Sequence, residues 1–351
     1  MLELWLASTH HSSNTWARLQ FMVEKGIMNL LSKIRSELGQ LSYSFKRRNT
    51  PKLWRDQVEA IRFLKVHNLP APRLKGPRQE VWAVSVVKNE LDILPSVLDH
   101  LFAQGIDRII VADNLSTDGT REYLRQRANE DSRLIFAEDN CDRHIQSEKM
   151  TYLSHLAWRS GARWIIPFDG DEFWYAENEK LGDFLRNAPD NMGVYYAGFH
   201  HTVPTVDSPE NIVDTELVMD TSYPFPGKCA FRSHPFAVVI PGNHDVCRLG
   251  NIEQRLEIVH LQYRGIAQIA RKVRVGTETS RRTGEDLSYF APHWEAGSKL
   301  SDAEIAEVWE NISHGRPDER IKFVAKGPMV WGKFLQWRYW NEDGSIAKGD
   351  A

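Results

Sequence analysis

The stretch Trp164-Ile-Ile-Pro-Phe-Asp169-Gly-Asp171-Glu172-Phe-Trp174 ends an apolar segment with three carboxylates in four residues. Neighbouring like charges repel, and each raises the pKa of the others, so this crowding opposes folding. A divalent cation would remove the conflict, because Mg²⁺ and Mn²⁺ take oxygen ligands and commonly share one or two carboxylates with substrate phosphates. The alternative is an acidic surface turn after a strand. The strand context and the upstream sequence favour the metal site.

The charge of the chain is unevenly distributed. The 351 residues carry a formal net charge of −3, which argues against bulk binding to nucleic acid. Residues 1–79 contain 14 Lys and Arg against 5 Asp and Glu, whereas the remainder contains 30 against 42. A basic arm on an acidic body suggests an anionic partner such as a membrane surface. A solvated tail, or a helix packed on the body, is the alternative.

Other features indicate the compartment. Three cysteines are too few for a disulfide framework, so a reducing cytoplasm is the simplest setting. We expect no transmembrane helix, which requires roughly 18 apolar residues, and no secretory signal. Residues 20–38 place an apolar stripe on one helical face, which is typical of an interfacial membrane helix, of a core or of a dimer contact. We therefore expect a cytoplasmic protein with possible peripheral contact at the inner face of the membrane through its basic arm.

Strands and helices alternate after a linker at residues 70–77, which contains three prolines and a glycine. Short β-rich apolar runs predict strands, and amphipathic periods predict the helices between them. The pattern predicts strands at 81–87, 108–112, 134–136 and 163–168 and helices at 91–104, 117–129 and 145–160. Such alternation indicates a parallel sheet between two layers of helices.

The alternation decays beyond residue 173. The later sequence predicts strands at 193–199, 228–232, 236–240 and 256–261, helices at 264–275 and 301–313, and a long loop or insertion at 201–227.

Polar residues follow three of the predicted strands. Lys88-Asn89-Glu90 comes after the first strand, Asp113-Asn114 after the second, and the acidic cluster after the fourth. Carboxyl ends of parallel strands meet at one edge of a sheet, where ligands bind in open α/β folds. We therefore expect one site, suited to a nucleotide diphosphate held through a divalent cation.

Three segments carry a family resemblance: Val86-Val-Lys-Asn-Glu90, Val111-Ala-Asp-Asn-Leu-Ser-Thr-Asp-Gly-Thr120 and Phe168-Asp-Gly-Asp-Glu-Phe173. In this order they resemble the GT-A glycosyltransferases, and most of all the family-2-like branch with a D-x-D-E motif. Pro241-Gly-Asn-His-Asp245 and Ile258-Val-His-Leu-Gln-Tyr-Arg264 resemble later segments of that branch. The resemblance covers roughly residues 80–275. It implies a Rossmann-like three-layer α/β/α sandwich with a mostly parallel central sheet and an irregular C-terminal part.

The resemblance also implies roles for individual residues. Asp169, Asp171 and His260 would hold Mn²⁺ or Mg²⁺, and Glu172 would orient the site. Asp113 would accept a hydrogen bond from the base or ribose, and Asp169 would also reach the ribose. The expected nucleotide-binding residues are Val86, Lys88, Asn89, Glu90, Asp113, Asn114, Asp169, Arg264 and Lys272. We expect Arg264 and Lys272, eight residues apart, to share one helix face.

The catalytic base is harder to assign. Asp245 is the first candidate, with neighbouring His244 as a further active-site residue, because both lie on a polar turn. Asp214, Glu216 and Asp220 are rivals. Since Asp171 lies among like charges, we expect Asp171→Asn to abolish metal-dependent nucleotide binding and to leave folding intact or slightly improved.

The sequence thus predicts a metal-dependent glycosyltransferase that moves a sugar from a UDP- or GDP-type nucleotide-sugar to an acceptor hydroxyl, with inversion, in bacterial cell-surface polysaccharide or glycoconjugate synthesis. The alternatives are a catalytically silent nucleotide-binding scaffold and a nucleotidyltransferase. We expect three parts: a basic N-terminal arm or helical extension at 1–79, the nucleotide-sugar-binding catalytic domain at 80–275, and a C-terminal helical extension at 276–351 packed on that domain.

Overall fold

The computed structural model describes residues 38–42, 44–45, 51–73, 76, 78–143, 145–222, 227–283, 292–321, 323, 326–333, 337–340 and 346–348. The chain divides into two compact units, residues 1–48 and 49–351, and each is considered by itself. In the first unit, residues 38–42 and 44–45 are helical. The apolar stripe predicted at 20–38 lies outside the described residues except for Leu38. No helix within the described ranges is long and apolar enough to cross a membrane.

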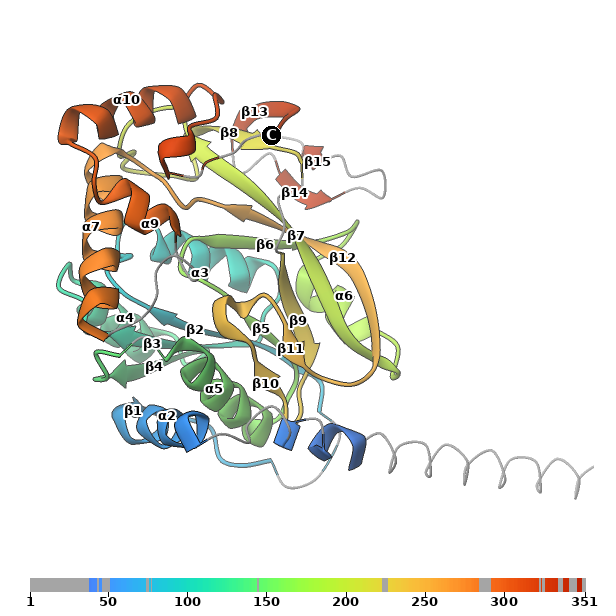
Figure 1. Cartoon of the computed structure of the whole chain (residues 1–351). Helices are drawn as coiled ribbons and strands as arrows, with labels where there is room; N and C mark the ends of the chain where they lie inside the picture. Colours follow the sequence, from blue (N-terminus) through green and yellow to red (C-terminus); the bar gives the residue numbers. More distant parts are fainter. Residues whose placement is uncertain are drawn as a thin grey trace, which may run out of the picture. The chain divides into compact units, whose positions relative to one another are not determined.

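The larger unit is built on a sheet whose first half is parallel (Figure 1). The four parallel strands confirm the predicted ones and lie in the order β4-β3-β2-β5. They are β2 (Glu80–Val87), β3 (Arg108–Asn114), β4 (Leu134–Asp139) and β5 (Ala162–Pro167). The chain runs outward from β2 to β4 and then returns to place β5 on the other side of β2. The crevice beyond β2 and β5 is therefore a topological switch point, where α/β sheets bind ligands.

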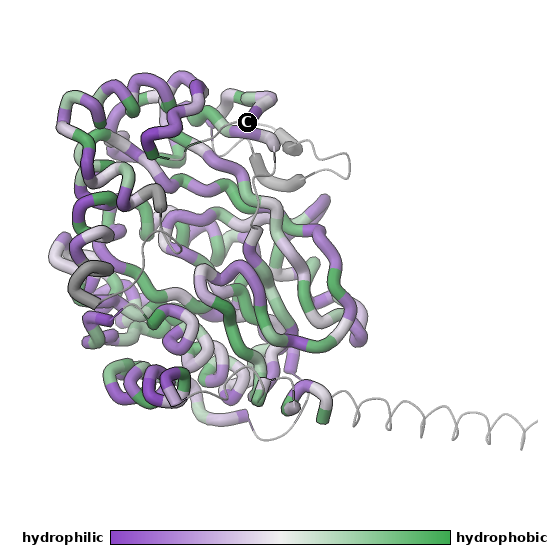
Figure 2. The backbone as a smooth tube through the Cα atoms, viewed as in Figure 1, coloured by the Kyte–Doolittle hydropathy of each residue, from purple (hydrophilic) through white to green (hydrophobic). Residues whose placement is uncertain are grey.

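Helices cover both faces of these strands. Alternate residues of β2 point to opposite faces, so Val81 and Ala83 join one core and Trp82 and Val84 another. The first core is completed by α3 (Leu94–Ala103), α4 (Thr120–Glu130) and α6 (Leu181–Asn187), and the second by α5 (Gln146–Ser160). Figure 2 shows the hydrophobic colouring along these central strands. Burial on both faces explains why each strand is a continuous apolar run. The three-layer α/β/α fold is thus confirmed.

The second half of the sheet is mixed, in the order β5-β9-β7-β12-β6. Its strands are β6 (Glu172–Ala176), β7 (Met192–Pro204), β9 (Lys228–Arg232) and β12 (Asn251–His260). The prediction of a loop at 201–227 was wrong in part, because β7 extends to Pro204 and β8 (Glu216–Asp220) pairs with both β7 and β13 (Met329–Lys333). Two small pairs complete the strands: β10 (Val238–Val239) with β11 (Val246–Cys247), and β14 (Trp337–Trp340) with β15 (Ile346–Lys348).

Helices near the C-terminus enclose a third core. They are α7 (Ile266–Thr283), α9 (Pro292–Gly297), α10 (Asp302–Ile312) and the short 3₁₀ helix η2 (Glu319–Ile321). Ser301 and Glu304 begin α10 with a reciprocal capping box. The predicted domain boundary at 275 falls inside α7. This helix also begins at Ile266 rather than at Arg264, so the expectation that Arg264 and Lys272 share a helix face was wrong.

The segment before residue 79 also contributes to the sheet. Helix α2 (Pro51–Phe63) leads into β1 (Leu64–Val66), which pairs antiparallel with β4. Ala60 and Leu64 are buried there. Residues 51–66, which we assigned to the N-terminal arm, are therefore part of the body.

Candidate active site

The loops that follow β2 and β3 are tied together at the carboxyl edge of the sheet. Asn89 has a left-handed backbone (φ 56°), a conformation that asparagine adopts more readily than most residues. Its backbone N–H donates to Ser116 Oγ (2.9 Å), and its Oδ1 accepts from the N–H of Thr117 (2.7 Å). Leu91 N–H donates to Asp118 Oδ2 (3.1 Å). The Ser-Thr-Asp segment thus fixes the loop that carries Asn89 and Glu90.

The two polar residues that end β3 have different surroundings. Asp113 is fully buried, and its Oδ2 accepts from Arg121 Nε (2.6 Å). Its Oδ1 has no hydrogen-bond partner among the described residues. Asn114 instead donates from Nδ2 to Asp139 Oδ2 (2.7 Å) and to the Cys141 carbonyl (2.6 Å). Asp113 therefore keeps an unused acceptor, whereas the Asn114 amide is engaged within the protein.

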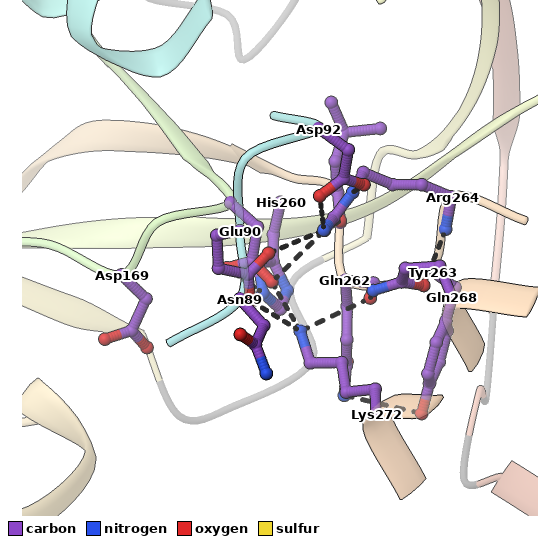
Figure 3. A network of polar contacts seen from close by, with 12 residues as sticks. Asn89, Glu90, Asp92, Asp169, His260, Gln262, Tyr263, Arg264, Gln268 and Lys272 are labelled. Carbon is purple, nitrogen blue, oxygen red and sulfur yellow. Dashed lines mark hydrogen bonds and ion pairs between the residues drawn. The ribbon is translucent and has the colours of Figure 1, made fainter. Parts of the chain in front are cut away.

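Buried Asp171 contacts His260, Arg264 and Lys272, three residues that Figure 3 labels. We call this polar cluster the Asp171 network; its members are Glu90, Asp92, Asp171, His260, Arg264 and Lys272. Lys272 Nζ donates to Asp171 Oδ2 (2.6 Å) and lies 3.9 Å from Glu90 Oε1. His260 Nε2 lies 3.2 Å from Asp171 Oδ1. This contact follows from strand pairing, because His260 in β12 lies opposite Glu172 in β6.

Arg264 joins the loop after β2 to this network. Its NH2 donates to Glu90 Oε2 (2.5 Å) and its Nε to Asp92 Oδ2 (2.7 Å). Its NH1 donates to the Leu261 carbonyl (2.8 Å) and lies 3.8 Å from Asp171 Oδ2. The guanidinium is almost wholly buried. Arg264 therefore acts here as the link that holds Glu90 and Asp92 beside Asp171.

These charges set the protonation states of the network. Burial opposes ionisation of Asp171, yet Lys272, His260 and Arg264 hold its pKa well below the usual range. Burial would lower the pKa of Lys272, but Asp171 and Glu90 raise it. Burial lowers the pKa of His260 against the attraction of Asp171. At neutral pH an ionised Asp171 therefore faces a charged Lys272 and a neutral His260.

Asp169 belongs to a separate group, and Figure 3 shows it apart from the dashed contacts around Lys272. The Asp169 network comprises Gln146, Asp169, Glu172, Lys228 and Asn243. Lys228 Nζ contacts both Asp169 Oδ2 (2.6 Å) and Glu172 Oε1 (3.1 Å). Asn243 Nδ2 donates to Asp169 Oδ1 (2.9 Å), and Gln146 Nε2 lies 3.4 Å from the same oxygen. The two aspartates of the D-x-D motif thus have different cationic partners.

Glu172 is fully buried beneath the motif. Its Oε2 accepts from the Asp169 backbone N–H (3.0 Å) and from Trp174 Nε1 (3.2 Å). Burial raises the pKa of Glu172, although the charge of Lys228 opposes this shift. The carboxylates of Asp169 and Glu172 in turn raise the pKa of Lys228 against the effect of burial. These contacts allow Glu172 to hold the Asp169 loop in position.

The predicted metal ligands do not meet as a set of three. Asp169 points to Lys228 and Asn243, and no three His, Cys, Asp or Glu side chains in the described part of the chain converge on one ion. Asp171 and His260 do fit, because two ligands each about 2.1 Å from one ion and about 90° apart lie about 3 Å from each other. Mg²⁺-type ions commonly keep waters and substrate phosphates as their other ligands.

The turn that carries the candidate bases also reaches this edge. His244 Nδ1 donates to the Gly227 carbonyl (2.9 Å), which leaves Nε2 as the acceptor, and burial lowers the pKa of the ring. Asp245 Oδ1 accepts from Tyr196 Oη (2.5 Å) and from Val246 N–H (2.7 Å).

The remaining predicted residues and the rivals lie as follows. Val86 and Lys88 are half-buried at the end of β2. Asp214 and Glu216 are exposed, and fully buried Asp220 accepts from Ser222 and from the backbone N–H of Lys326.

Several site residues were not predicted. Lys228, Asp92 and Gln146 carry no local signal, since a lone charged or amide residue beside a strand or helix is ordinary. Asn243 could have been found, because it lies in the Pro-Gly-Asn-His-Asp segment on which the resemblance rests. That segment reaches the D-x-D motif through Asn243.

Comparisons with known proteins support the family resemblance. Residues 82–250 match the model of the family described as Glycosyl transferase family 2. No curated protein matches the chain. Among solved structures, the chain is similar to the mannosyltransferase PcManGT from Pyrobaculum calidifontis, solved in complex with GDP-Man and Mn²⁺. The identity is 16%, the coverage 79% of this chain and 83% of the other, and the TM-score 0.34.

A second similar structure is S. aureus TarS 1-349, with 11% identity, coverage of 67% and 71%, and a TM-score of 0.32. Neither likeness is close enough to carry a conclusion about this chain. The family match covers all three polar loops and the parallel strands between them. The family match therefore supports the assignment of residues 82–250 to the glycosyl transferase family 2 domains that the resemblance predicts.

Proposed function

We propose that this chain transfers a sugar from a UDP- or GDP-type nucleotide-sugar to an acceptor hydroxyl, by direct displacement with inversion. The observation that carries the proposal is the Asp171 network. It places a carboxylate, an imidazole and two cationic groups beyond the ends of β2 and β5, where this fold class binds its ligand. The proposed setting is the cytoplasmic face of a bacterial membrane, in cell-surface polysaccharide or glycoconjugate synthesis.

Different residues would bind different parts of the donor nucleotide-sugar. Asp113 offers its unused Oδ1 to the base or ribose. Backbone around Val86, Lys88 and Asn89 lines the nucleoside pocket, and Asp169 reaches the ribose. Lys272 offers positive charge to the diphosphate. Arg264 adds a second positive charge nearby and also binds Glu90.

Asp171 and His260 would hold a divalent cation, Mn²⁺ or Mg²⁺. When bound, that ion supplies charge neutralisation for the leaving nucleoside diphosphate. The geometry favours His244 over Asp245 as the base that accepts the acceptor's proton. His244 keeps Nε2 as an acceptor, whereas Asp245 Oδ1 already receives two hydrogen bonds.

Thermal unfolding with UDP and with GDP, each with and without Mn²⁺, tests the proposal. We expect one nucleoside diphosphate to raise Tm in the presence of Mn²⁺ only, and one nucleotide-sugar to be slowly hydrolysed without an acceptor. Asp171→Asn should lose both effects. Asp190→Asn is the matched control, because the Asp190 side chain is 99% exposed.

The absence of any Mn²⁺-dependent stabilisation by either nucleotide would refute the proposal. Stabilisation without hydrolysis or transfer of any nucleotide-sugar would indicate a nucleotide-binding scaffold instead.

A further inference from the structure

Helix α2 leaves an apolar stripe exposed, although it also buries Ala60 against the body. Trp54, Val58 and Ile61, at helical spacings of four and three residues, are 50%, 62% and 47% exposed. They form one stripe, since residues at these spacings lie on the same side of a helix. Asp56 and Gln57 in the same helix are, by contrast, nearly inaccessible (5% and 8% exposed). A surface helix usually turns its apolar stripe toward the core, whereas α2 buries Ala60 and leaves this larger stripe exposed.

The acidic and amide side chains of α2 contact the body of the protein. Asp56 forms an ion pair with Arg143 (2.8 Å), and Glu59 contacts the same guanidinium. Gln57 Nε2 lies 3.4 Å from the Glu148 carbonyl of α5, on which α2 packs. Both acidic residues of α2 are thereby turned toward the body and neutralised.

The charges left on the outer side are all basic. Lys52, Arg55 and Arg62 in α2, and Lys65 in β1, are exposed. Within the described part of the chain, none of the four is paired with a carboxylate. The outer surface of α2 and β1 therefore combines an apolar stripe, one member of which is a tryptophan, with exposed basic residues that have no carboxylate partner among the residues the structure describes.

We propose that this outer side, which we call the α2 face, docks on an anionic lipid bilayer. An exposed apolar stripe flanked by Lys and Arg is the pattern of helices that lie in the membrane interface, and tryptophan favours the headgroup region. Charge complementarity selects an anionic bilayer. The acidic residues that would be repelled by lipid phosphates face inward, and the basic residues that would be attracted face outward.

This inference locates the membrane contact of the proposed function on one helix. It can be tested without catalysis, so the two proposals can fail separately. The docked helix is also connected to the active site. It packs on α5, whose first residue, Gln146, contacts Asp169. Docking would therefore hold the Asp169 side of the site at a fixed distance from the membrane surface.

Vesicle sedimentation of the full chain provides the first test. We expect binding to phosphatidylcholine vesicles that contain phosphatidylglycerol, and little binding to phosphatidylcholine alone. Arg55→Gln with Arg62→Gln should weaken binding about 30-fold, which corresponds to about 1 kcal/mol for each of two basic residues at an anionic surface. Val58→Glu with Ile61→Glu should weaken it at least as much.

The matched control is Val206→Glu with Ile252→Glu, which changes two apolar residues that are 52% and 58% exposed elsewhere on the body. It should bind like wild type. Loss of binding by the control to the same extent, no loss in the α2 variants, or no binding of wild type would each overturn the proposal. Circular dichroism and Tm should be unchanged in all variants, because the altered side chains are exposed.

A second measurement distinguishes the bilayer from other occupants of the α2 face. Cys141, Cys229 and Cys247 are buried, so Val58→Cys can be labelled selectively with a polarity-sensitive dye under native conditions. We expect water-like emission in solution and a blue shift on adding anionic vesicles. A dye that is already blue-shifted and does not respond to vesicles would overturn the proposal. Residues 1–48 would then cover the face if the signal is independent of protein concentration, and a second copy would cover it if the signal grows with concentration.

Discussion

Lys272→Met removes the ammonium group that lies closest to Asp171 and keeps most of the side-chain length. The ammonium of Lys272 donates to Asp171 Oδ2 at 2.6 Å, and the two side chains are only 18% and 5% exposed. After the substitution, Asp171 keeps His260 at 3.2 Å and Arg264 at 3.8 Å. The variant therefore leaves a buried carboxylate with weaker compensation, in an otherwise unchanged site.

The expected loss of stability follows from that geometry. Removing one partner of a buried ion pair typically costs about 3–5 kcal/mol, because the other charge is left uncompensated. Since Arg264 and His260 remain, we expect the lower end, about 3 kcal/mol at pH 7. For a chain of this size that corresponds to a fall in Tm of roughly 4–5 °C. Urea unfolding followed by tryptophan fluorescence measures the change in unfolding free energy directly.

The same substitution should change metal binding in the opposite direction. In the free protein, Lys272 competes with a divalent cation for Asp171. We expect Lys272→Met to bind Mn²⁺ about tenfold more tightly in the absence of nucleotide, since each 1.4 kcal/mol is a factor of about ten. Calorimetry gives both affinities. Mn²⁺ at about 100 times its Kd should restore roughly 2.7 kcal/mol of the lost stability. The affinity for a nucleoside diphosphate should fall, because a cationic partner is lost.

Two variants serve as controls. Lys272→Arg keeps the charge and should lose less stability. Lys299→Met removes an exposed cation that is paired with Glu295 at 3.4 Å, and such surface pairs contribute at most about 1 kcal/mol. A destabilisation of Lys272→Met no larger than that of Lys299→Met, or an unchanged Mn²⁺ affinity, would refute the reasoning.

Three further predictions concern other residues. Asp171→Asn should lose Mn²⁺-dependent nucleotide binding and about 3 kcal/mol of stability. Calorimetry measures the binding and urea unfolding measures the stability. A stable variant that still binds nucleotide through Mn²⁺ would contradict this prediction. Burial lowers the pKa of His100 to about 4, although the Trp174 carbonyl accepts a hydrogen bond from its ring. Between pH 6.5 and 4 the unfolded chain therefore binds more protons, and stability should fall by up to about 3 kcal/mol as pH is lowered through this window. His100→Gln should flatten that part of the curve in urea titrations at several pH values; an identical curve would exclude His100 as the cause. Ser301→Ala removes the cap of α10 and should cost about 1 kcal/mol, whereas an unchanged Tm would show that the capping box with Glu304 is not stabilising.

The parallel half of the fold could be predicted because its strands carry their signal locally. The run at 81–87 is buried on both faces, so nearly every residue is apolar, and the observed strand extends it by one residue. β8 and β1 were not predicted, because short strands of this kind carry little local signal. β8 has five residues in a region rich in Pro, Asp and Thr, and its stability comes from pairing with β7 and with β13, more than 100 residues later. A short strand whose partner is distant leaves little local pattern.

The place of the site could be predicted, but the pairing of its charges could not. Polar loops after parallel strands must share one edge, and the observed strand order puts the loops of Glu90, Asp113 and Asp171 at the ends of strands in one sheet. The partner of each carboxylate depends on strands far along the chain. Lys228, for example, is 59 residues from Asp169. The expectation that Asp171→Asn would relieve repulsion and slightly improve folding thus has the wrong sign, because Asp171 is paired with cations.

The choice between a metal site and an acidic surface turn can now be argued from burial and charge. A surface turn would leave its carboxylates in water, but Asp171 and Glu172 are 3% and 0% exposed. The Asp171 and Asp169 networks together contain five carboxylates, at Glu90, Asp92, Asp169, Asp171 and Glu172, against three permanent cations, at Arg264, Lys272 and Lys228.

These networks therefore contain two more carboxylates than permanent cations. Burial and neighbouring carboxylates raise the pKa of Glu90 and Glu172, so the excess negative charge is itself unfavourable in the free protein. A site of this charge should bind a diphosphate poorly by itself, since like charges repel at short range in a low dielectric. A divalent cation would balance the excess and reverse the sign of the field at the phosphates. We infer that cation and nucleotide bind together, and that Lys272 leaves Asp171 for the diphosphate when they do.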